Sequence, residues 1–458
     1  MFLPVVLPSL GGGKVARFRN SALLSVLRRL LPTMLEALAI RMVVVVLYYR
    51  QLPDADLNYE QFGWEVGWVA RSLASGHGFS SPYFPASGPT ALIPPIHPFI
   101  LAMLFRTFGV YSLTAGFLIL TFNSICSALT SVAVYFSAQF SLGDRAARAA
   151  AWMWALYPFA IYFSAGRVWE YALTALLFTT CFCIAQRLPQ WTGWPSWAGF
   201  GALYGVTALC NPSVISVLPF LLGNAAWRSR KTSHAFRNGL VALTALLLML
   251  TPWTIRNYRV MHVLCPVRDN FWHEFYSGNN PEMKSFDEPS YPSTHPPDNP
   301  VEMKKFLSLG EVKYMEDKHH IAVDWVRQHP AYFIKGIIHR AVYYWTGYWD
   351  ISMAYQQIDP TEIPNMFYVC CITLLMFRGL RRLWSSNQAA AIQYLLLLAF
   401  FPATYYLTRV MMDYRQPIEP EIIVLAIAGA MPFRRTRQFA DAWSEKIVDA
   451  ETLALGHV

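Results

Sequence analysis

Four acidic side chains gather in one polar, aromatic segment near the N-terminus, residues 50–111. They are Asp54, Asp56, Glu60 and Glu65. In a helix, Glu65 shares one face with Trp68 and Val69, because residues three and four apart are neighbours. Apolar surroundings raise the pKa of a carboxylate and make it a better proton acceptor near neutral pH. We therefore expect a general base here, Glu65 first and Asp56 or Glu60 next. The simpler alternative is a solvated acid on an interfacial helix.

Several arginines follow apolar stretches later in the chain and could bind an anion. The candidates are Arg256, Arg259, Arg268, Arg409 and Arg415. A planar guanidinium binds phosphate oxygens and stays charged, so it can stabilise a departing phosphate. Anchoring of a helix end is the simpler role of Arg256 and Arg259. An ion pair with Asp413 or Glu419 is the simpler role of the last two arginines.

Glu170 and Arg167 lie at the ends of two apolar stretches. Ionisable groups at membrane depth usually face protein or a cavity, so these two either form a simple pair or support a site. His77, His97 and His273 lack metal-ligand spacing, and six of the seven cysteines lie in apolar stretches. The sequence therefore predicts no metal site, no disulfide framework and no evident cofactor.

The composition is that of a membrane protein. Of the 458 residues 55% are hydrophobic and only 14% are charged, whereas soluble globular proteins carry about 25% charge. The net charge of +9 does not indicate nucleic acid, because the basic residues cluster between apolar stretches. The clusters lie at residues 14–29, 145–148, 228–237, 378–382 and 434–437. This distribution is typical of positive charge kept on the cytoplasmic side.

The apolar stretches predict an all-α polytopic membrane protein with about ten to twelve transmembrane helices. The expected helices are 32–49, 62–75, 96–108, 112–140, 149–163, 171–187, 197–209, 214–227, 239–253, 332–349, 364–377, 389–407 and 422–432. Ten spans put every basic cluster inside the cell and the polar segments 50–111 and 254–330 outside. Residues 96–108 are short for a span, and basic residues interrupt 332–349, so both are expected at the membrane surface.

This topology predicts three parts of the chain. Residues 1–31 are a cytoplasmic N-terminus, residues 32–433 a multi-pass domain, and residues 434–458 a cytoplasmic tail. The N-terminal apolar stretch lacks a small-residue cleavage site after it, so we expect a retained first span. Within that span Glu36 and Arg41 are one turn apart, and we expect them to pair or to face protein.

A series of short motifs runs through the chain in a fixed order. They include Trp64-Glu65 within 64–80, Gly88-Pro89-Thr90-Ala91, Tyr157-Pro158, Trp169-Glu170, Pro252-Trp253, Gly278-Asn279 and Tyr414-Arg415. In this order they resemble the GT-C superfamily of membrane glycosyltransferases. More narrowly, they resemble bacterial glycosyltransferase family 39, which includes protein O-mannosyltransferases and aminoarabinose transferases. The resemblance covers nearly the whole chain.

The resemblance implies a glycosyltransferase (hexosyl- or pentosyltransferase) of the cell inner membrane with an extracytoplasmic site. It implies a polyprenyl-phosphate-linked sugar as donor and an acidic base in the first outer segment. Other members carry two adjacent acids there, whereas the acids of this chain are spread out. It favours Arg415, with Tyr414 beside it, as the phosphate ligand. Expected partners are membrane lipids, the donor and a glycolipid, polysaccharide or protein acceptor, but no nucleic acid.

Two other functions share this topology. A transporter or flippase of lipid-linked sugars would show inverted repeats, broken helices and midplane charges. In this chain most acids and unexplained arginines lie outside the apolar stretches. A ligase or polymerase of surface polysaccharide would have the same arrangement of spans. The sequence leaves the sugar, the acceptor and metal dependence open.

Overall fold

The structure is a computed structural model that describes residues 13–51, 58–83, 86–229, 234–283, 291–347 and 362–432. Asp54, Asp56 and the tail 434–458 lie outside these ranges. Within them the chain forms helices and no strand, apart from an isolated bridge between Ser80 and Pro89.

The first half of the chain contains ten α-helices among the described residues. They are α1 (Gly13–Gln51), α2 (Glu65–Ala74), α3 (Ile96–Phe108), α4 (Leu113–Leu142), α5 (Asp144–Ala155), α6 (Pro158–Ala165), α7 (Tyr171–Arg187), α8 (Trp194–Cys210), α9 (Leu218–Arg228) and α10 (Ala235–Met261). The 3-10 turn η3 (Pro212–Val217) leads into α9.

The second half begins with the second polar segment and ends with further apolar helices. Its elements are α11 (Phe271–Gly278), α12 (Tyr291–Thr294), α13 (Pro300–Leu309), α14 (Glu311–Gln328), α15 (Pro330–Thr346), α17 (Glu362–Ser386), α18 (Gln388–Phe400), α19 (Ala403–Leu407), the 3-10 turn η4 (Met412–Ile418) and α20 (Glu419–Ala430).

Five helices in the described ranges are long and apolar enough to cross a membrane. They are Val26–Tyr49, Leu113–Leu142, Tyr171–Gln190, Ala235–Met261 and Gln388–Leu407. The predicted all-helical membrane fold is confirmed. The count of ten to twelve spans, and the division at residues 31 and 433, stay predictions. Residue 31 lies inside the continuous helix α1.

The membrane helices pack through small residues that let two backbones approach closely. A Cβ added at Gly201 on α8 would lie 1.9 Å from the carbonyl oxygen of Ala242 on α10. One added at Gly379 on α17 would lie 1.8 Å from the carbonyl oxygen of Leu425 on α20. Helix association within lipid depends on such close contacts, because lipid tails leave little hydrophobic drive between helices.

Two of the predicted helices are broken where the sequence contains proline. The expected helix 149–163 ends at Ala155 and restarts at Pro158, and 389–407 ends at Phe400 and restarts at Ala403 after Pro402. Proline has no N–H for the helical ladder, and it disfavours helical geometry in the residue before it. The prediction of one unbroken helix was wrong in both places.

Arg41 faces protein at the first of these breaks. Its side chain is fully buried and donates hydrogen bonds to the carbonyl oxygen of Ala155 (2.9 Å) and to Ser127 Oγ (3.0 Å). A helix end leaves carbonyl groups without helical partners, and the guanidinium satisfies one of them. Arg41 thereby ties α1 to α4 and α5.

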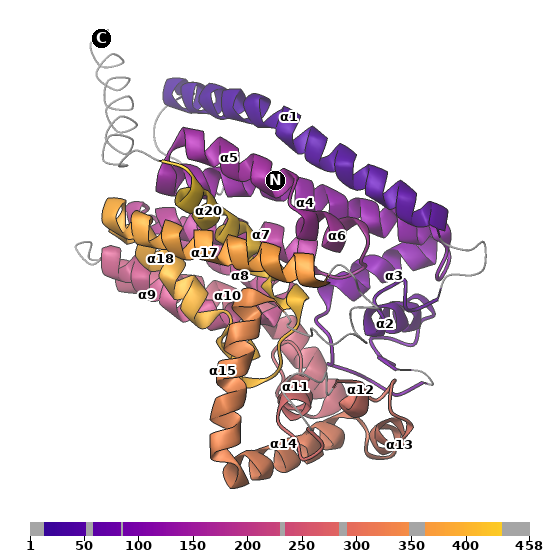
Figure 1. Ribbon diagram of the computed structural model, residues 1–458. Coiled ribbons are helices and arrows are strands. Elements are labelled where there is room, and N and C mark those ends of the chain that lie inside the picture. The colour runs from indigo at the N-terminus through magenta and orange to yellow at the C-terminus, as the bar shows by residue number, and fades with distance from the viewer. Residues whose placement is uncertain are drawn as a thin grey trace.

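The second polar segment builds a second body of helices beside the membrane helices (Figure 1). In Figure 1, α15 runs away from the membrane helices, α14 lies at its far end, and α13 packs on α14. Helix α11 packs on α14, and α2 packs on α3. Glu311 on α14 accepts hydrogen bonds from Thr90 and Ala91, so the first and second polar segments meet beside the helical layers.

Candidate functional site

A cavity of approximately 500 Å³ lies where the two polar segments meet. It takes acidic side chains from Glu60, Glu65, Glu170, Glu274, Asp298 and Asp413. Its basic and aromatic walls include Arg268, Arg409, His97, His273, His295, Tyr59, Trp64, Trp169 and Tyr414. This size and mixture of aromatic and convergent polar groups are typical of a small-molecule site.

The turn before α2 aims Glu65 at this cavity. Gly63 has φ +80°, and a Cβ there would lie 2.3 Å from the carbonyl oxygen of Val168. Trp64 also has positive φ, at 49°, which is strained for a bulky residue. Glu65 then becomes the first residue of α2, where the helix N-terminus favours a carboxylate.

A histidine from the second polar segment holds Glu65. His295 Nε2 lies 2.8 Å from Glu65 Oε1, and His295 Nδ1 lies 2.9 Å from Asp298 Oδ2. The His295 side chain is only 6% exposed, while Asp298 is 50% exposed. One imidazole ring therefore stands between two carboxylates that both line the cavity, and Asp298 is the more exposed of the two.

The expected rise in the pKa of Glu65 is not found. Burial alone would raise its pKa, but the hydrogen bond and positive charge of His295 lower the pKa below the ordinary glutamate value. Glu65 is thus a carboxylate at neutral pH, ready to accept a proton, although a weaker base than an isolated buried glutamate.

Two arginines share one acidic partner on another wall of the cavity. Arg409 Nε lies 2.5 Å from Glu274 Oε2, and Arg268 Nη2 lies 4.0 Å from Glu274 Oε1. Asn270 accepts from Arg268 Nε (2.5 Å) and donates to Glu274 Oε1 (3.1 Å). Burial raises the pKa of Glu274, but Arg409 and other cations outweigh it and lower the pKa to about 2. Glu274 remains charged and holds both guanidiniums at the cavity.

Glu170 and Asp413 form a third acidic wall. Asn211 Nδ2 donates to Glu170 Oε1 at 3.4 Å, and the Tyr171 hydroxyl donates to Asp413 Oδ2 at 2.5 Å. Burial raises the pKa of both carboxyls above the ordinary value. Tyr414 lines the same space next to Arg409.

Glu60 also lines the cavity but is exposed. His97 faces the same space, and its buried ring nitrogens have no hydrogen-bond partner within the described ranges. Those ranges also hold no group of three or more His, Cys, Asp or Glu side chains placed to bind a metal ion.

Arg415 does not line the cavity. Its Nε and Nη2 donate two hydrogen bonds of 3.1 Å to the two carboxylate oxygens of Glu419, and both side chains are buried. Its Nη1 lies 3.3 Å from Thr373 Oγ1. The structure thus shows Arg415 in the ion pair that the sequence offered as its simpler role.

Arg256 and Arg167 support the cavity wall from outside. Arg256 donates to the carbonyl oxygens of Thr90 (2.6 Å) and Phe79 (2.5 Å), so it fixes the first polar segment to α10. Arg167 Nε donates to the Tyr162 hydroxyl at 2.8 Å, and its guanidinium lies 5.8 Å from the Trp64 ring centre. Arg167 does not pair with Glu170.

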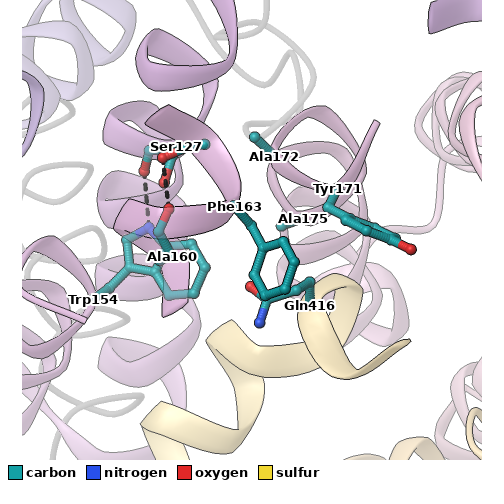
Figure 2. A pocket seen from close by; sticks show the side chains of 9 residues that line it. Ser127, Trp154, Ala160, Phe163, Tyr171, Ala172, Ala175 and Gln416 are labelled. Carbon is teal, nitrogen blue, oxygen red and sulfur yellow. Dashed lines mark hydrogen bonds between the residues drawn. The ribbon is translucent and has the colours of Figure 1, made fainter. Parts of the chain in front are cut away.

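A second hollow, of approximately 10 Å³, lies between α4, α5, α7 and η4 (Figure 2). Figure 2 shows Trp154 Nε1 donating to the carbonyl oxygen of Ser127, at 2.8 Å. Small and apolar side chains such as Ala160, Phe163 and Ala172 line most of it. It has room for no more than a water molecule, whereas the large cavity can hold a small-molecule ligand.

Sequence reasoning missed three residues of this cavity, which are Glu274, His295 and Asp298. His295 stands in a proline-rich stretch without a motif, 230 positions from Glu65, and Asp298 follows it. Glu274 is 135 positions from Arg409. A histidine and an acid three residues apart, His295 and Asp298, were the only local signal, and many surface turns contain such a pair.

Comparisons with known proteins point to one group. Residues 93–255 match the family model of dolichyl-phosphate-mannose-protein mannosyltransferases. A search of the curated proteins found no match. Glu65 and the cavity residues after 255 lie outside the matched region.

Among solved structures, an oligosaccharyltransferase of Archaeoglobus fulgidus with Zn and sulfate matches at 12% identity and TM-score 0.45, covering 92% of this chain and 51% of that chain. The same archaeon's AglB, with an inhibitory peptide and a dolichol-phosphate, matches at 12% identity and TM-score 0.44, covering 86% and 50%. ArnT of Cupriavidus metallidurans bound to undecaprenyl phosphate matches at 13% identity and TM-score 0.37, covering 86% and 77%.

This chain spans about half the length of the archaeal oligosaccharyltransferases. The family match lies within the apolar helices α3 to α10, where several of the motifs also occur. The resemblance that the motifs indicated is therefore confirmed. This chain is a helical membrane protein that is similar, over residues 93–255, to the dolichyl-phosphate-mannose-protein mannosyltransferases.

Proposed function

We propose that this protein transfers a sugar from a polyprenyl-phosphate-linked donor to an acceptor hydroxyl outside the cytoplasm. One observation carries the proposal: a carboxylate, Glu65, and two arginines, Arg268 and Arg409, line the same cavity. The match of residues 93–255 to mannosyltransferases supports the class of reaction. The sugar is a hexose or a pentose.

The step needs a proton acceptor and a stabilised leaving group. The oxygen of the acceptor hydroxyl attacks the anomeric carbon, and the hydroxyl proton passes to Glu65. The bond between the anomeric carbon and the phosphate oxygen breaks, and its electron pair stays on the phosphate. The phosphate already is a good leaving group, so no strong general acid is required. Arg268 and Arg409 stabilise the charge that develops on it.

Arg268 and Arg409 replace Arg415 as the phosphate ligands in this proposal. Arg415 already forms a bidentate, buried ion pair with Glu419. Breaking such a pair would leave an unpaired buried charge. Arg268 and Arg409 have side chains 26% and 15% exposed, at the cavity. Each guanidinium carries five N–H donors, more than Glu274 alone can accept.

We also propose a cell (inner) membrane location, with both termini cytoplasmic and the cavity on the outer side. The basic clusters between apolar stretches support this orientation through the positive-inside rule. A glycolipid, a polysaccharide or a protein would supply the acceptor hydroxyl. Divalent metal dependence is a question for the same assay.

The test is transfer by the purified protein in lipid nanodiscs. A panel of polyprenyl-phosphate sugars labelled in the sugar is supplied with envelope glycolipid, polysaccharide and protein fractions, with and without a chelator. Mass spectrometry should find labelled acceptor and an equal amount of free polyprenyl phosphate. Movement of donor across a liposome bilayer without any labelled acceptor would instead establish a flippase.

A paired set of variants connects the reaction to the cavity. The double variant Arg268→Ala/Arg409→Ala should lose both donor binding and transfer. Arg327→Ala, whose side chain is 76% exposed on α14, is the matched control and should behave as wild type. Unchanged transfer by the double variant would refute the assignment of the phosphate ligands.

A further inference from the structure

We infer that His295 is a positioning residue: an imidazolium between Glu65 and Asp298 that fixes Glu65 as a carboxylate facing the cavity. This role rests on the proposed function, because it concerns the group that takes the acceptor's proton. His295 touches no reacting atom in this arrangement. It acts through Glu65.

Hydrogen-bond chemistry requires the charged ring. Both ring nitrogens lie within 3 Å of a carboxylate oxygen, at 2.8 Å and 2.9 Å. An ionised carboxylate only accepts hydrogen bonds, and a neutral imidazole has a single N–H. A neutral ring would therefore point a lone pair at one of the two acids. Protonation gives both nitrogens a donor and satisfies both contacts.

The surroundings of the ring favour this charge. The other titratable groups around the His295–Glu65–Asp298 cluster are Tyr59, Tyr83, His273 and Glu274. The ring of His273 lies 6.3 Å away, and burial lowers its pKa to about 4, so it adds no positive charge at neutral pH. Burial opposes the charge on His295, but its hydrogen bonds to Glu65 and Asp298 raise its pKa above the ordinary value.

The contact also joins the two polar segments at the reacting carboxylate. Glu65 is the first residue of α2 in the first polar segment, and His295 follows α12 in the second. The hydrogen bond from His295 Nε2 therefore holds Glu65 in place at the edge of the cavity. Asp298 is half exposed and reaches the outer solvent. Loss of the proton from His295 would leave only one N–H for two carboxylates. Glu65 would then lose the positive charge of His295 that keeps it ionised, or the hydrogen bond from His295 that orients it.

This arrangement predicts how activity depends on pH. Glu65 has a lowered pKa, so it stays an effective base well into the acid range. On the alkaline side, activity should fall as the pH rises through the raised pKa of His295, where the ring becomes neutral. The acid limit then reports Glu65 and the alkaline limit reports His295.

The experiment measures kcat and KM for the donor between pH 4.5 and 9.5 in nanodiscs. In His295→Gln the amide donates to Glu65 without titrating, so the alkaline fall should vanish. Its kcat should drop about 10- to 100-fold, as for loss of a hydrogen bond between charged groups, with KM little changed. In His295→Ala the acid limit should move to higher pH, because burial of Glu65 is no longer opposed. In Asp298→Asn the alkaline fall should move to lower pH.

His320→Gln, an exposed histidine on α14, is the matched control and should keep the wild-type profile. A purely structural role of His295 would lower the amount of folded protein without moving either pH limit. An unchanged alkaline fall in His295→Gln would therefore overturn the inference, even if that variant is less stable. Absence of transfer by the wild-type protein would instead overturn the proposed function.

Discussion

The cavity wall and the packed helices beside it hold buried charge in different ways. In the helices, Arg415 pairs with Glu419 only four residues along the chain, and the two side chains are 6% and 2% exposed. On the cavity wall, Arg409 pairs with Glu274 from a distant segment, and these side chains are 15% and 18% exposed. The two arginines are six positions apart in the sequence.

The difference distinguishes an ion pair that supports the fold, Arg415–Glu419, from one that lines the cavity, Arg409–Glu274. A pair four residues apart forms as soon as its local turn forms, and full burial leaves it no access to a ligand. A pair between distant segments forms only when α11, which carries Glu274, docks beside the segment that carries Arg409. It creates a charged wall that lines the cavity. Under the proposed function, the pair with a distant partner and partly exposed side chains is the one that meets the ligand.

The largest expected effect is the loss of transfer when Glu65 of the cavity wall is replaced. Glu65→Gln keeps the shape of the side chain but removes the proton acceptor, so transfer should fall about 10²- to 10⁴-fold, the usual worth of general acid–base catalysis. The thermal midpoint should change little. Glu316→Gln, an exposed acid on α14, is the matched control for charge. Near wild-type turnover in Glu65→Gln would move the base to Asp56, Glu60 or another acid of the cavity.

The next effect compares the two arginines directly. Arg409→Ala should lower turnover about 10²-fold through lost stabilisation of the leaving phosphate. It should cost less stability than Arg415→Ala, because Glu274 keeps Arg268 beside it and is partly exposed. Arg415→Ala should instead destabilise the protein by about 3 kcal/mol or more, because Glu419 is left as an unpaired buried charge. Thermal unfolding and transfer, measured on the same samples, separate the two. Equal losses of stability in both variants would erase the distinction between the two regions.

Much of the fold follows from the sequence for a simple physical reason. A membrane helix satisfies its own backbone and needs only a run of apolar residues, so α3, α4 and α7 lie within about two residues of their predicted bounds. The breaks at Pro158 and Pro402 were missed although proline predicts them. Apolar content alone does not reveal whether a helix continues past a proline, because neighbouring helices can satisfy the freed groups.

The cavity was much harder to predict. Glu65 could be predicted from its aromatic and apolar neighbours on one helix face. Arg268 and Arg409 could be predicted because they are arginines that follow apolar stretches. Their partners His295 and Glu274 lie 230 and 135 positions away, and no local spacing connects such residues. The preference for Arg415 came from a motif that also contains Glu419. Only the three-dimensional arrangement shows that Glu419 already forms an ion pair with the Arg415 guanidinium.

A smaller effect tests the packed helices. Gly201→Ala should lower the thermal midpoint, because its Cβ would lie 1.9 Å from the carbonyl oxygen of Ala242 and force α8 and α10 apart. Overpacking of this kind costs about 1–3 kcal/mol. Gly223→Ala on α9 meets nothing within 4 Å and should be neutral or slightly stabilising, since alanine favours helix. Equal midpoints in the two variants would contradict close packing of α8 on α10.

The smallest effect is a pH dependence of stability where the two polar segments join. Glu311 accepts hydrogen bonds from Thr90 Oγ1 (2.5 Å) and the Ala91 amide (2.6 Å), and Asp269 donates its own amide to the Ala91 carbonyl. Burial raises the pKa of Asp269 from 3.8 to about 6. The folded protein therefore binds a proton here that the unfolded chain has already released.

Because the folded state holds the extra proton, this contribution to stability is complete below pH 3.8 and disappears as the pH rises through about 6. The free energy of unfolding should thus decline across that window. Burial also raises the pKa of Glu311 beside it, so Asp269→Asn removes one of two titrations and should lessen the decline, while Asp324→Asn, an exposed acid on α14, should not. Thermal midpoints from pH 4 to 7.5 measure this. A wild-type midpoint that rises steadily over the window, and is unaffected by Asp269→Asn, would show that Asp269 takes up no proton at this joint when the protein folds.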